Sequence, residues 1–191
     1  MSDVVVILKG RLKRREFLRI DSNNESLRHA SVLIPLFRRS EDFFILFTKR
    51  TNSVEHHKGQ ISFPGGAVDP EDGSYLNAAL REAREEIGLR EKDVEMIGRI
   101  DDAVAHVSHF VIHPFVGVIP YPYDFKINKR EVDRLIEVPL REVVIQNREK
   151  DETDFEFQGR IYPAPAYEYR GDLIWGATAR ILKNLLDIIG E

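Results

Sequence analysis

Apolar side chains are grouped along the chain in short runs, and the spacing within each run predicts a strand or a helix. Continuous or alternating runs predict strands at 30–37, 43–50, 60–63, 94–101 and 109–120. The first two read "ASVLIPLF" and "FFILFTKR", which is typical of strands buried on both faces, and a polar turn separates them. A further hairpin is expected to turn at Gln158–Gly159.

Two longer segments have the apolar spacing of helices. The first covers residues 74–87 and is ended by Gly88, a residue type favoured at helix C-termini. The second covers residues 172–189, and residues 131–144 mix helical and loop signals. This order of elements, mostly strands with one internal and one terminal helix, predicts an α/β fold with helices packed on a mixed sheet.

Composition narrows the class of protein. Hydrophobic residues make up 42% and charged residues 31% of the 191 positions, as in ordinary globular proteins, and the formal net charge of −4 argues against non-specific nucleic-acid binding. The absence of cysteine excludes disulfides and thiolate zinc sites. The run "VVVIL" is too short for a signal peptide, and no apolar run approaches the roughly 20 residues that span a bilayer. We therefore expect a soluble, cytoplasmic protein without a membrane segment.

Residues 1–29 form a separate segment. Its basic run "KGRLKRREFLR" is expected to be partly helical, with the charges on a solvated face. No repeat or low-complexity linker interrupts the remainder. The expected organisation is a basic extension, 1–29, packed on one domain, 30–191.

The helix at 74–87 has two unlike faces. At 100° per residue, one stripe is apolar and falls within about 60°: Leu76, Leu80, Ala83 and Ile87. The carboxylates of Glu82, Glu85 and Glu86 fall within about 100° on nearly the opposite side. The ordinary interpretation is a solvated face with an Arg81–Glu85 ion pair. Three clustered acids that follow a glycine pair instead favour a site for Mg²⁺ or Mn²⁺, ions suited to phosphate chemistry.

The pattern "GG-x5-D-x8-REAREEIGL" resembles the Nudix box, whose family pattern is G-x5-E-x7-R-E-U-x-E-E-x-G-U with U aliphatic. It departs from that pattern in two ways, because Asp72 replaces the first glutamate and one extra residue precedes Arg81. Both departures are similar to the coenzyme A pyrophosphatase branch of the family. A second stretch, "LFTKRTNSVEHHKGQISFPGG" at 46–66, resembles that branch's upstream signature, and the likeness continues over 31–189.

The resemblance implies a Nudix-type α/β/α sandwich, in which a mixed, curved sheet lies between helices. It also implies that the metal ligands are Glu82, Glu85, Glu86 and the backbone carbonyl of Gly66. Arg81 would orient the glutamates by ion pairing. Glu85 is the expected general base, and Glu131 and Glu137 are the alternative candidates. Asp72 is expected to cap the helix or hold the loop rather than bind metal.

By the same resemblance, the residues expected to shape the substrate site are Arg50, His57, Lys58, Gln60 and Phe63. His57 matches the signature better than His56, and Phe63 could equally be a core residue. A minority hypothesis is that the basic run helps to hold the 3′-phosphate of coenzyme A; its members are Lys9, Arg11, Lys13, Arg14, Arg15 and Arg19. A remote alternative is a zinc site formed by His106, His109 and His113.

The resemblance thus implies metal-dependent hydrolysis of coenzyme A to 4′-phosphopantetheine and adenosine 3′,5′-bisphosphate, with the acyl and oxidised forms of coenzyme A as further candidate substrates. The nearest alternative is the same chemistry on another nucleoside diphosphate derivative, such as ADP-ribose or NADH. A more distant alternative is a non-catalytic module that senses a nucleotide. The acyl-chain preference, the preferred metal and the oligomeric state are not predicted.

Overall fold

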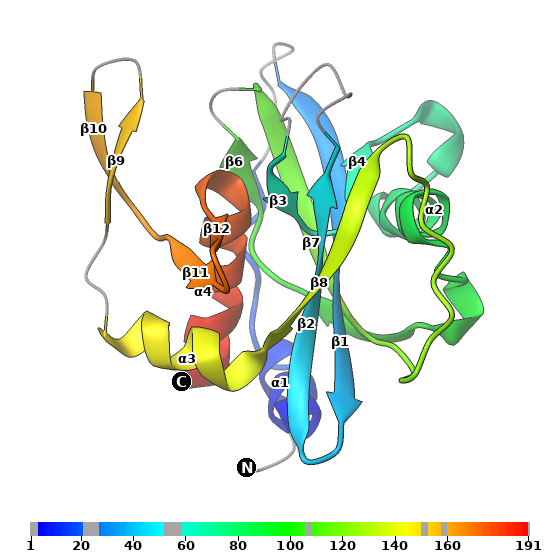
Figure 1. Ribbon diagram of the computed structural model, residues 1–191. Coiled ribbons are helices and arrows are strands. Elements are labelled where there is room, and N and C mark those ends of the chain that lie inside the picture. The colour runs from blue at the N-terminus through cyan, green and yellow to red at the C-terminus, as the bar shows by residue number, and fades with distance from the viewer. Residues whose placement is uncertain are drawn as a thin grey trace.

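A computed structural model of the chain describes residues 4–20, 27–51, 59–105, 108–149, 153–157 and 160–190 (Figure 1). The helices are α1 (Val4–Leu12), α2 (Tyr75–Ile87), α3 (Leu140–Glu149) and α4 (Gly176–Gly190), with single 3-10 turns η1 (Pro70–Asp72) and η2 (Glu91–Asp93). The strands are β1 (Arg28–Arg39), β2 (Asp42–Arg50), β3 (Ile61–Ser62), β4 (Gly65–Ala67), β5 (Glu95–Arg99), β6 (Ala103–Ala105), β7 (Phe110–Val118), β8 (Val132–Pro139), β9 (Thr153–Phe157), β10 (Arg160–Ala164), β11 (Tyr167–Tyr169) and β12 (Asp172–Ile174).

The main sheet has the order β3-β2-β1-β7-β5, with β4 paired to β1, β6 to β7 and β8 to β2. Only the β1–β7 pair is parallel among these described strands, so the sheet is mixed as expected. β4 pairs with β1 so that Gly66 lies opposite Ser31 and Gly65 opposite Val32. This register places the glycine pair beside the central strand and next to α2.

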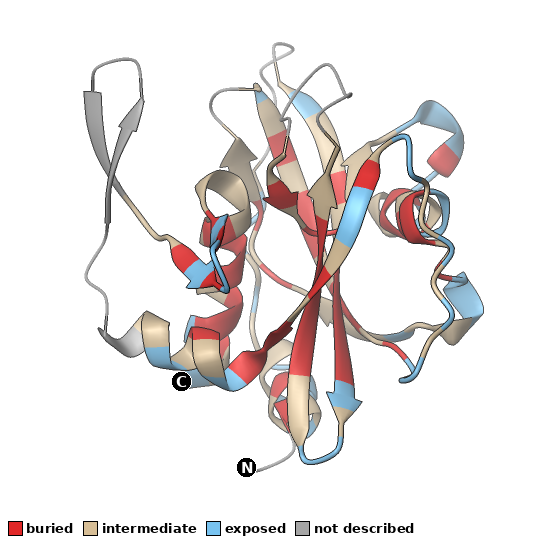
Figure 2. Ribbon diagram, in the orientation of Figure 1, coloured by how far each residue is buried: buried red, intermediate tan, exposed pale blue. Residues whose placement is uncertain are grey.

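Helices cover both faces of the sheet, which gives three layers (Figures 1 and 2). On β1, Leu33 and Phe37 belong to the core cluster under α2, whereas Ile34 and Leu36 face the cluster formed with α1, α3 and α4. This alternation explains why the strand reads as a continuous apolar run, since it is buried on both faces. The predicted α/β/α arrangement is therefore confirmed.

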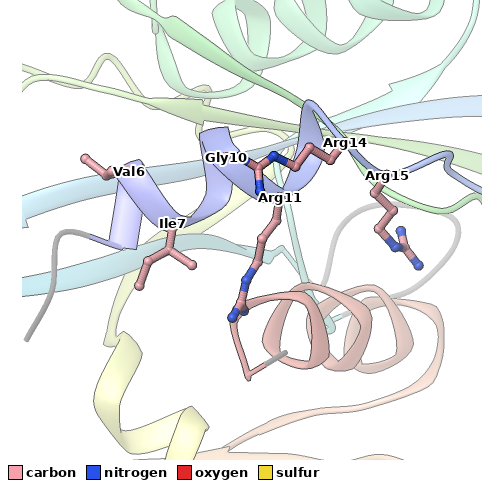
Figure 3. Close-up of a pocket in the computed structure, with 6 residues that line it drawn as sticks. All are labelled: Val6, Ile7, Gly10, Arg11, Arg14 and Arg15. Atoms are coloured by element: carbon pink, nitrogen blue, oxygen red, sulfur yellow. The ribbon is translucent and has the colours of Figure 1, made fainter.

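The basic N-terminal segment contains α1, which lies on the face of the sheet opposite α2. Val4 and Leu8 are buried there, and Arg15 binds Asp101 with hydrogen bonds of 2.7 and 2.8 Å. A hollow of ≈ 570 Å³ beside α1 is lined by Val6, Ile7, Gly10, Arg11, Arg14 and Arg15 (Figure 3). α1 itself lies on the face opposite α2, and contact of the basic run with a 3′-phosphate stays a prediction.

Two details differ from the sequence expectations, and a third agrees with them. Residues 132–139 form strand β8, which pairs along β2, so only the following residues are helical. The last helix begins at Gly176 rather than at Asp172, because Asp172–Ile174 pairs with β11 as strand β12. The expected hairpin is formed by the antiparallel strands β9 and β10, which flank residues 158–159; those two residues themselves lie outside the described residues. No helix in the described part of the chain has the length and apolar content needed to cross a membrane.

Candidate active site

Helix α2 positions the acidic residues, and its ends are defined by local sequence. Ser74 is the N-cap and its Oγ accepts a hydrogen bond of 3.1 Å from the backbone N–H of Asn77. Gly88 ends the helix in the left-handed conformation, with φ of 70°. The bounds match the predicted helix, and Leu80, Ala83 and Ile87 face the core as expected.

Arg81 joins the helix to the loop that precedes it. Its Nε and Nη2 donate to the carboxylate of Asp72 at 2.7 and 3.0 Å, and Nη2 also donates to the carbonyl of Ala67 at 3.0 Å. Its Nη1 donates to Glu82 at 2.8 Å and to Glu85 at 3.3 Å. These hydrogen bonds hold the pKa of the Asp72 carboxyl below its usual value. Asp72 therefore anchors the loop, while the helix cap is Ser74.

Glu86 is buried, which the helical-wheel argument did not predict. Only 2% of its side chain is exposed, and its carboxylate accepts a 3.3 Å hydrogen bond from the backbone N–H of Gly65. The guanidinium Nη1 of Arg50 lies 3.6 Å from Glu86 Oε1. Burial outweighs these two favourable contacts and raises the pKa of Glu86 to about 8. The site thus contains a carboxyl group whose charge is poorly compensated by the described protein atoms.

Glu82 lies between Glu86 and Arg81, against the glycine pair. A Cβ added to Gly66 would come within 2.5 Å of the Glu82 carboxyl carbon, so this position accommodates only glycine without moving that carboxylate. Burial raises the pKa of Glu82, and the contact with Arg81 opposes that shift. Glu85 is the most exposed of the three, at 50% of its side chain.

A fourth carboxylate approaches the cluster from the loop before β8. The amide of Asn128 donates to Glu131 at 2.9 Å, and the backbone N–H of Asn128 donates to the carbonyl of Glu86 at 2.8 Å. The charge of Glu131 contributes to the raised pKa values of Glu82 and Glu86. Glu137, the other alternative candidate for the general base, is six residues after Glu131 and roughly 20 Å from it along an extended strand. It accepts a 2.6 Å hydrogen bond from Arg39, so it is not part of this cluster.

The donor set fits a hard divalent cation, which prefers carboxylate and carbonyl oxygen atoms. Among the described residues, however, no three acidic or histidine side chains already surround a common point at coordinating distance. Arg81 donates to one oxygen atom of Glu82 and to one of Glu85, so the second oxygen of each carboxylate is not bonded to this guanidinium. The buried and poorly compensated Glu86 is the observation that favours a cation here.

The predicted substrate residues separate into three groups. Arg50 lies in the site beside Glu86, and the carbonyl of Gln60 accepts a 2.9 Å hydrogen bond from the backbone N–H of Arg50. Phe63 does not line the site, because its ring is 2% exposed and stacks on Phe47 in the core at 4.7 Å. The expected substrate contact at Phe63 is therefore corrected to a packing role. His57 and Lys58 lie outside the described residues.

The suggested histidine zinc site is not formed by the described residues. His113 is buried and hydrogen-bonded to Asp102, whereas His109 is exposed at a turn with φ of 55°. His106 lies outside the described residues. The sequence did not reveal the Asn128 contacts or the Arg50–Glu86 pair, because both join segments that are distant in the chain and have no local pattern.

Comparisons with known proteins agree with this geometry. The sequence matches the family model described as the NUDIX domain over residues 27–162. Proteins named uncharacterized Nudix hydrolase NudL are 37% identical in Cronobacter sakazakii and 36% identical in Escherichia coli strain SMS-3-5. Each alignment covers 94% of this chain and 93% of the relative. Neither name specifies coenzyme A.

Solved structures support the fold. The NUDIX hydrolase from Alicyclobacillus acidocaldarius superposes with a TM-score of 0.57 at 18% identity, covering 84% of this chain and 91% of that chain. The MutT/nudix family protein from Enterococcus faecalis gives a TM-score of 0.58 at 12% identity, covering 94% and 67%. The Nudix-type architecture expected from the motif is thereby confirmed. The chain belongs to the Nudix hydrolase family.

Proposed function

We propose that this protein hydrolyses the diphosphate linkage of coenzyme A, giving 4′-phosphopantetheine and adenosine 3′,5′-bisphosphate. One observation carries the proposal: Arg50 lies 3.6 Å from Glu86. Arg50 belongs to the 46–66 segment that resembles the coenzyme A branch, and Glu86 belongs to the Nudix box helix. This contact supports the proposal, because it brings the segment that resembles the coenzyme A branch beside the carboxylate cluster.

The residues proposed to hold Mg²⁺ or Mn²⁺ are Glu82, Glu85, Glu86 and the carbonyl of Gly66. A bound divalent cation would neutralise charge on the diphosphate oxygens and lower the pKa of a water molecule. Arg81 would keep the glutamates in position through its anchor on Asp72. Arg50, Gln60 and, outside the described residues, His57 and Lys58 are the proposed substrate contacts.

In the proposed reaction the oxygen of a water molecule bonds to one phosphorus of the diphosphate. The bond from that phosphorus to the bridging oxygen breaks, and the bridging oxygen leaves with the other phosphate. Glu85 is our proposed acceptor of the water proton, since it is the most exposed of the box glutamates. Glu131 is the second candidate, because its carboxylate approaches Glu82 and Glu86 from the opposite loop.

Product analysis tests the substrate. Purified protein with Mg²⁺ or Mn²⁺ should release 4′-phosphopantetheine and adenosine 3′,5′-bisphosphate from coenzyme A faster than it cleaves ADP-ribose or NADH. Glu85→Gln should abolish this cleavage. The matched control is Glu91→Gln, since Glu91 is exposed and outside the cluster, and it should leave the rate unchanged.

Other outcomes would revise the proposal in defined ways. Faster cleavage of ADP-ribose or NADH would keep the box chemistry and reject coenzyme A as the substrate. No cleavage of any diphosphate with either metal would favour the non-catalytic nucleotide-sensing module. A comparison of Glu85→Gln with Glu131→Gln at saturating Mn²⁺ distinguishes the two candidates, because loss of the base lowers kcat even when the metal site is filled and leaves KM little changed.

A further inference from the structure

A cluster of polar and aromatic side chains lies beneath the start of α2, outside the groups used in the proposed reaction. Its members are His29 on β1, Tyr75 at the start of α2, Arg99 on β5, Asp102 after β5 and His113 on β7. Asp102 and His113 are buried, and each side chain is only 2% exposed. Buried polar groups of this kind are normally fully hydrogen-bonded, and such networks specify a single arrangement of the elements they join.

Hydrogen bonds connect three of these side chains in a line. The carboxylate of Asp102 lies 2.9 Å from Nδ1 of His113, and Nε2 of His113 lies 2.9 Å from Nδ1 of His29. Arg99 also donates to Asp102, and the hydroxyl of Ser31 donates to the backbone carbonyl of His113 at 3.0 Å. Both ring nitrogens of His113 are therefore engaged, so the ring is fixed in one orientation.

The fixed ring supports the first residue of the box helix. The rings of Tyr75 and His113 are stacked, with centroids 3.7 Å apart and an angle of 17° between their planes. The Tyr75 hydroxyl also lies 3.4 Å from Nδ1 of His29. Stacking at this distance leaves the first turn of α2 little freedom to shift across the sheet.

The same cluster is attached to the other end of the loop that enters the helix. The backbone carbonyl of His29 accepts a 3.0 Å hydrogen bond from the N–H of Val68. Between Val68 and Tyr75 lies Asp72, to which Arg81 is anchored. The backbone of β1 thus holds the Val68 end of this connection and the histidine side chains hold the Tyr75 end, while its middle holds the arginine that contacts Glu82 and Glu85.

We propose that His113 is a positioning residue for the Nudix box. Supported by Asp102 and His29, its ring fixes Tyr75 and with it the first turn of α2, and thereby the placement of Arg81 and the carboxylates that are to bind the cation. The activity part of this inference rests on the proposed function. The metal-binding part is tested without any substrate.

The test compares variants that remove the Tyr75–His113 stack, variants that remove the hydrogen bonds of the His113 ring, and a control that leaves both in place. Tyr75→Leu removes the stack, whereas Tyr75→Phe keeps the stack and removes only the long hydroxyl contact with His29. His113→Phe keeps an aromatic ring but removes both ring hydrogen bonds. The matched control is Tyr121→Leu, which removes a stack on Phe37, a residue in the core beneath α2 that is not part of this cluster. For each variant we would measure the Mn²⁺ dissociation constant by calorimetry, thermal unfolding, and kcat and KM for coenzyme A.

Outer residues that orient metal ligands typically change metal affinity by about 10- to 100-fold when they are replaced. We expect Tyr75→Leu and His113→Phe to weaken Mn²⁺ binding roughly tenfold and to lower kcat by a similar factor. KM should change by less than about twofold, because uniform substrate binding is not affected. Tyr75→Phe should restore the wild-type values, and Tyr121→Leu should alter only the unfolding temperature.

Unchanged Mn²⁺ affinity and kcat in folded Tyr75→Leu would overturn the positioning role, and so would an equal loss in Tyr75→Phe. If His113→Phe does not fold, the two Tyr75 variants still decide the question. If the wild-type protein binds Mn²⁺ but cleaves no diphosphate, the proposed function fails, and the Mn²⁺ titrations alone decide whether the cluster positions the box.

Discussion

The guanidinium of Arg81 binds the carboxylate of Asp72 through two hydrogen bonds, from Nε to Oδ1 at 2.7 Å and from Nη2 to Oδ2 at 3.0 Å. Asp72 is almost fully buried, and its Oδ2 also accepts a 2.8 Å hydrogen bond from the backbone N–H of Asp69. One ion pair therefore joins the turn η1 to the middle of α2. Because the same guanidinium contacts Glu82, the position of the loop and the position of that carboxylate depend on each other.

Arg81→Lys should destabilise the protein and reduce its activity. Lysine keeps the charge but cannot reproduce the planar fork that reaches Asp72 and Glu82 together. We expect the free energy of unfolding to fall by about 1–3 kcal/mol, as for a buried group that loses its partner. Urea denaturation measures this loss. Arg84→Lys, on an exposed neighbouring position, should change stability by less than about 0.5 kcal/mol. Equal stability of the two variants would contradict the anchoring role.

Metal binding should release a proton from Glu86. Burial raises its pKa to about 8, so the apo carboxyl is protonated at neutral pH and must ionise to bind a cation. Calorimetry in buffers of different ionisation enthalpy should show about one proton released per Mn²⁺ near pH 6.5 and almost none above pH 9. Glu86→Gln should lose this release, while Glu91→Gln should retain it. Proton release independent of Glu86 would refute the assignment.

The raised pKa of Glu86 should also make the metal-free protein less stable as the pH rises. The folded pKa of Glu86 lies above its unfolded value, so the folded state holds a proton that the unfolded state has lost. The resulting stabilisation is complete below the unfolded pKa and is lost as the pH rises towards 8. A comparison of unfolding free energies for wild type and Glu86→Gln from pH 5 to pH 9 measures it, and a difference that does not change with pH would contradict the burial effect.

The two glycines before α2 should respond differently to alanine. In Gly66→Ala the new Cβ would meet the flexible end of the Glu82 side chain, so Mn²⁺ affinity should fall roughly tenfold while stability changes by about 1 kcal/mol or less. In Gly65→Ala the Cβ would lie 2.3 Å from the Ser31 carbonyl and 2.7 Å from Val32 Cα. Since this is backbone, we expect a loss of about 1–3 kcal/mol or more.

Gly10→Ala is the matched control for both glycine variants, because a Cβ there meets no atom within 4 Å. It should bind Mn²⁺ like the wild type and gain up to about 1 kcal/mol from its helical position. Thermal unfolding and Mn²⁺ calorimetry on the three variants separate the two effects. Wild-type Mn²⁺ affinity in Gly66→Ala would show that the Glu82 carboxylate need not lie against this glycine.

His29 should make the protein sensitive to mild acid. Burial, and secondly the neighbouring His113, lower the pKa of His29, although the charge of Asp102 opposes the shift. The contribution of His29 to stability is therefore fully present above the unfolded pKa of about 6.5 and declines as the pH falls below it. The NMR titration of the His29 ring should give a midpoint below that value. The difference in unfolding free energy between wild type and His29→Gln should shrink from pH 7.5 to pH 5, and a constant difference would contradict this.

The local sequence pattern was sufficient to predict the helix that carries the candidate site. The apolar spacing, the cap at Ser74 and the stop at Gly88 all act within a few residues, so the predicted and observed bounds agree. The buried strands and the α/β class follow equally from short-range pattern, and the box motif identifies the family. The last helix was misplaced at its start because the pairing of β12 with β11 overrides the local helical pattern.

The tertiary structure alone decided how the site is completed. The helical wheel places Glu86 on the acidic face, but β4 and the loop at Asn128 cover it, and this burial raises its pKa. Pairing of β8 along β2 brings Glu131 to the end of β2 beside Arg50 and carries Glu137 away to Arg39. The stacking of Phe63 on Phe47 and the hydrogen bond between Asp102 and His113 also join residues that lie on different elements. Sequence pattern reports the neighbours of a residue along one helix or strand, whereas these contacts depend on the register between elements that are distant in the chain.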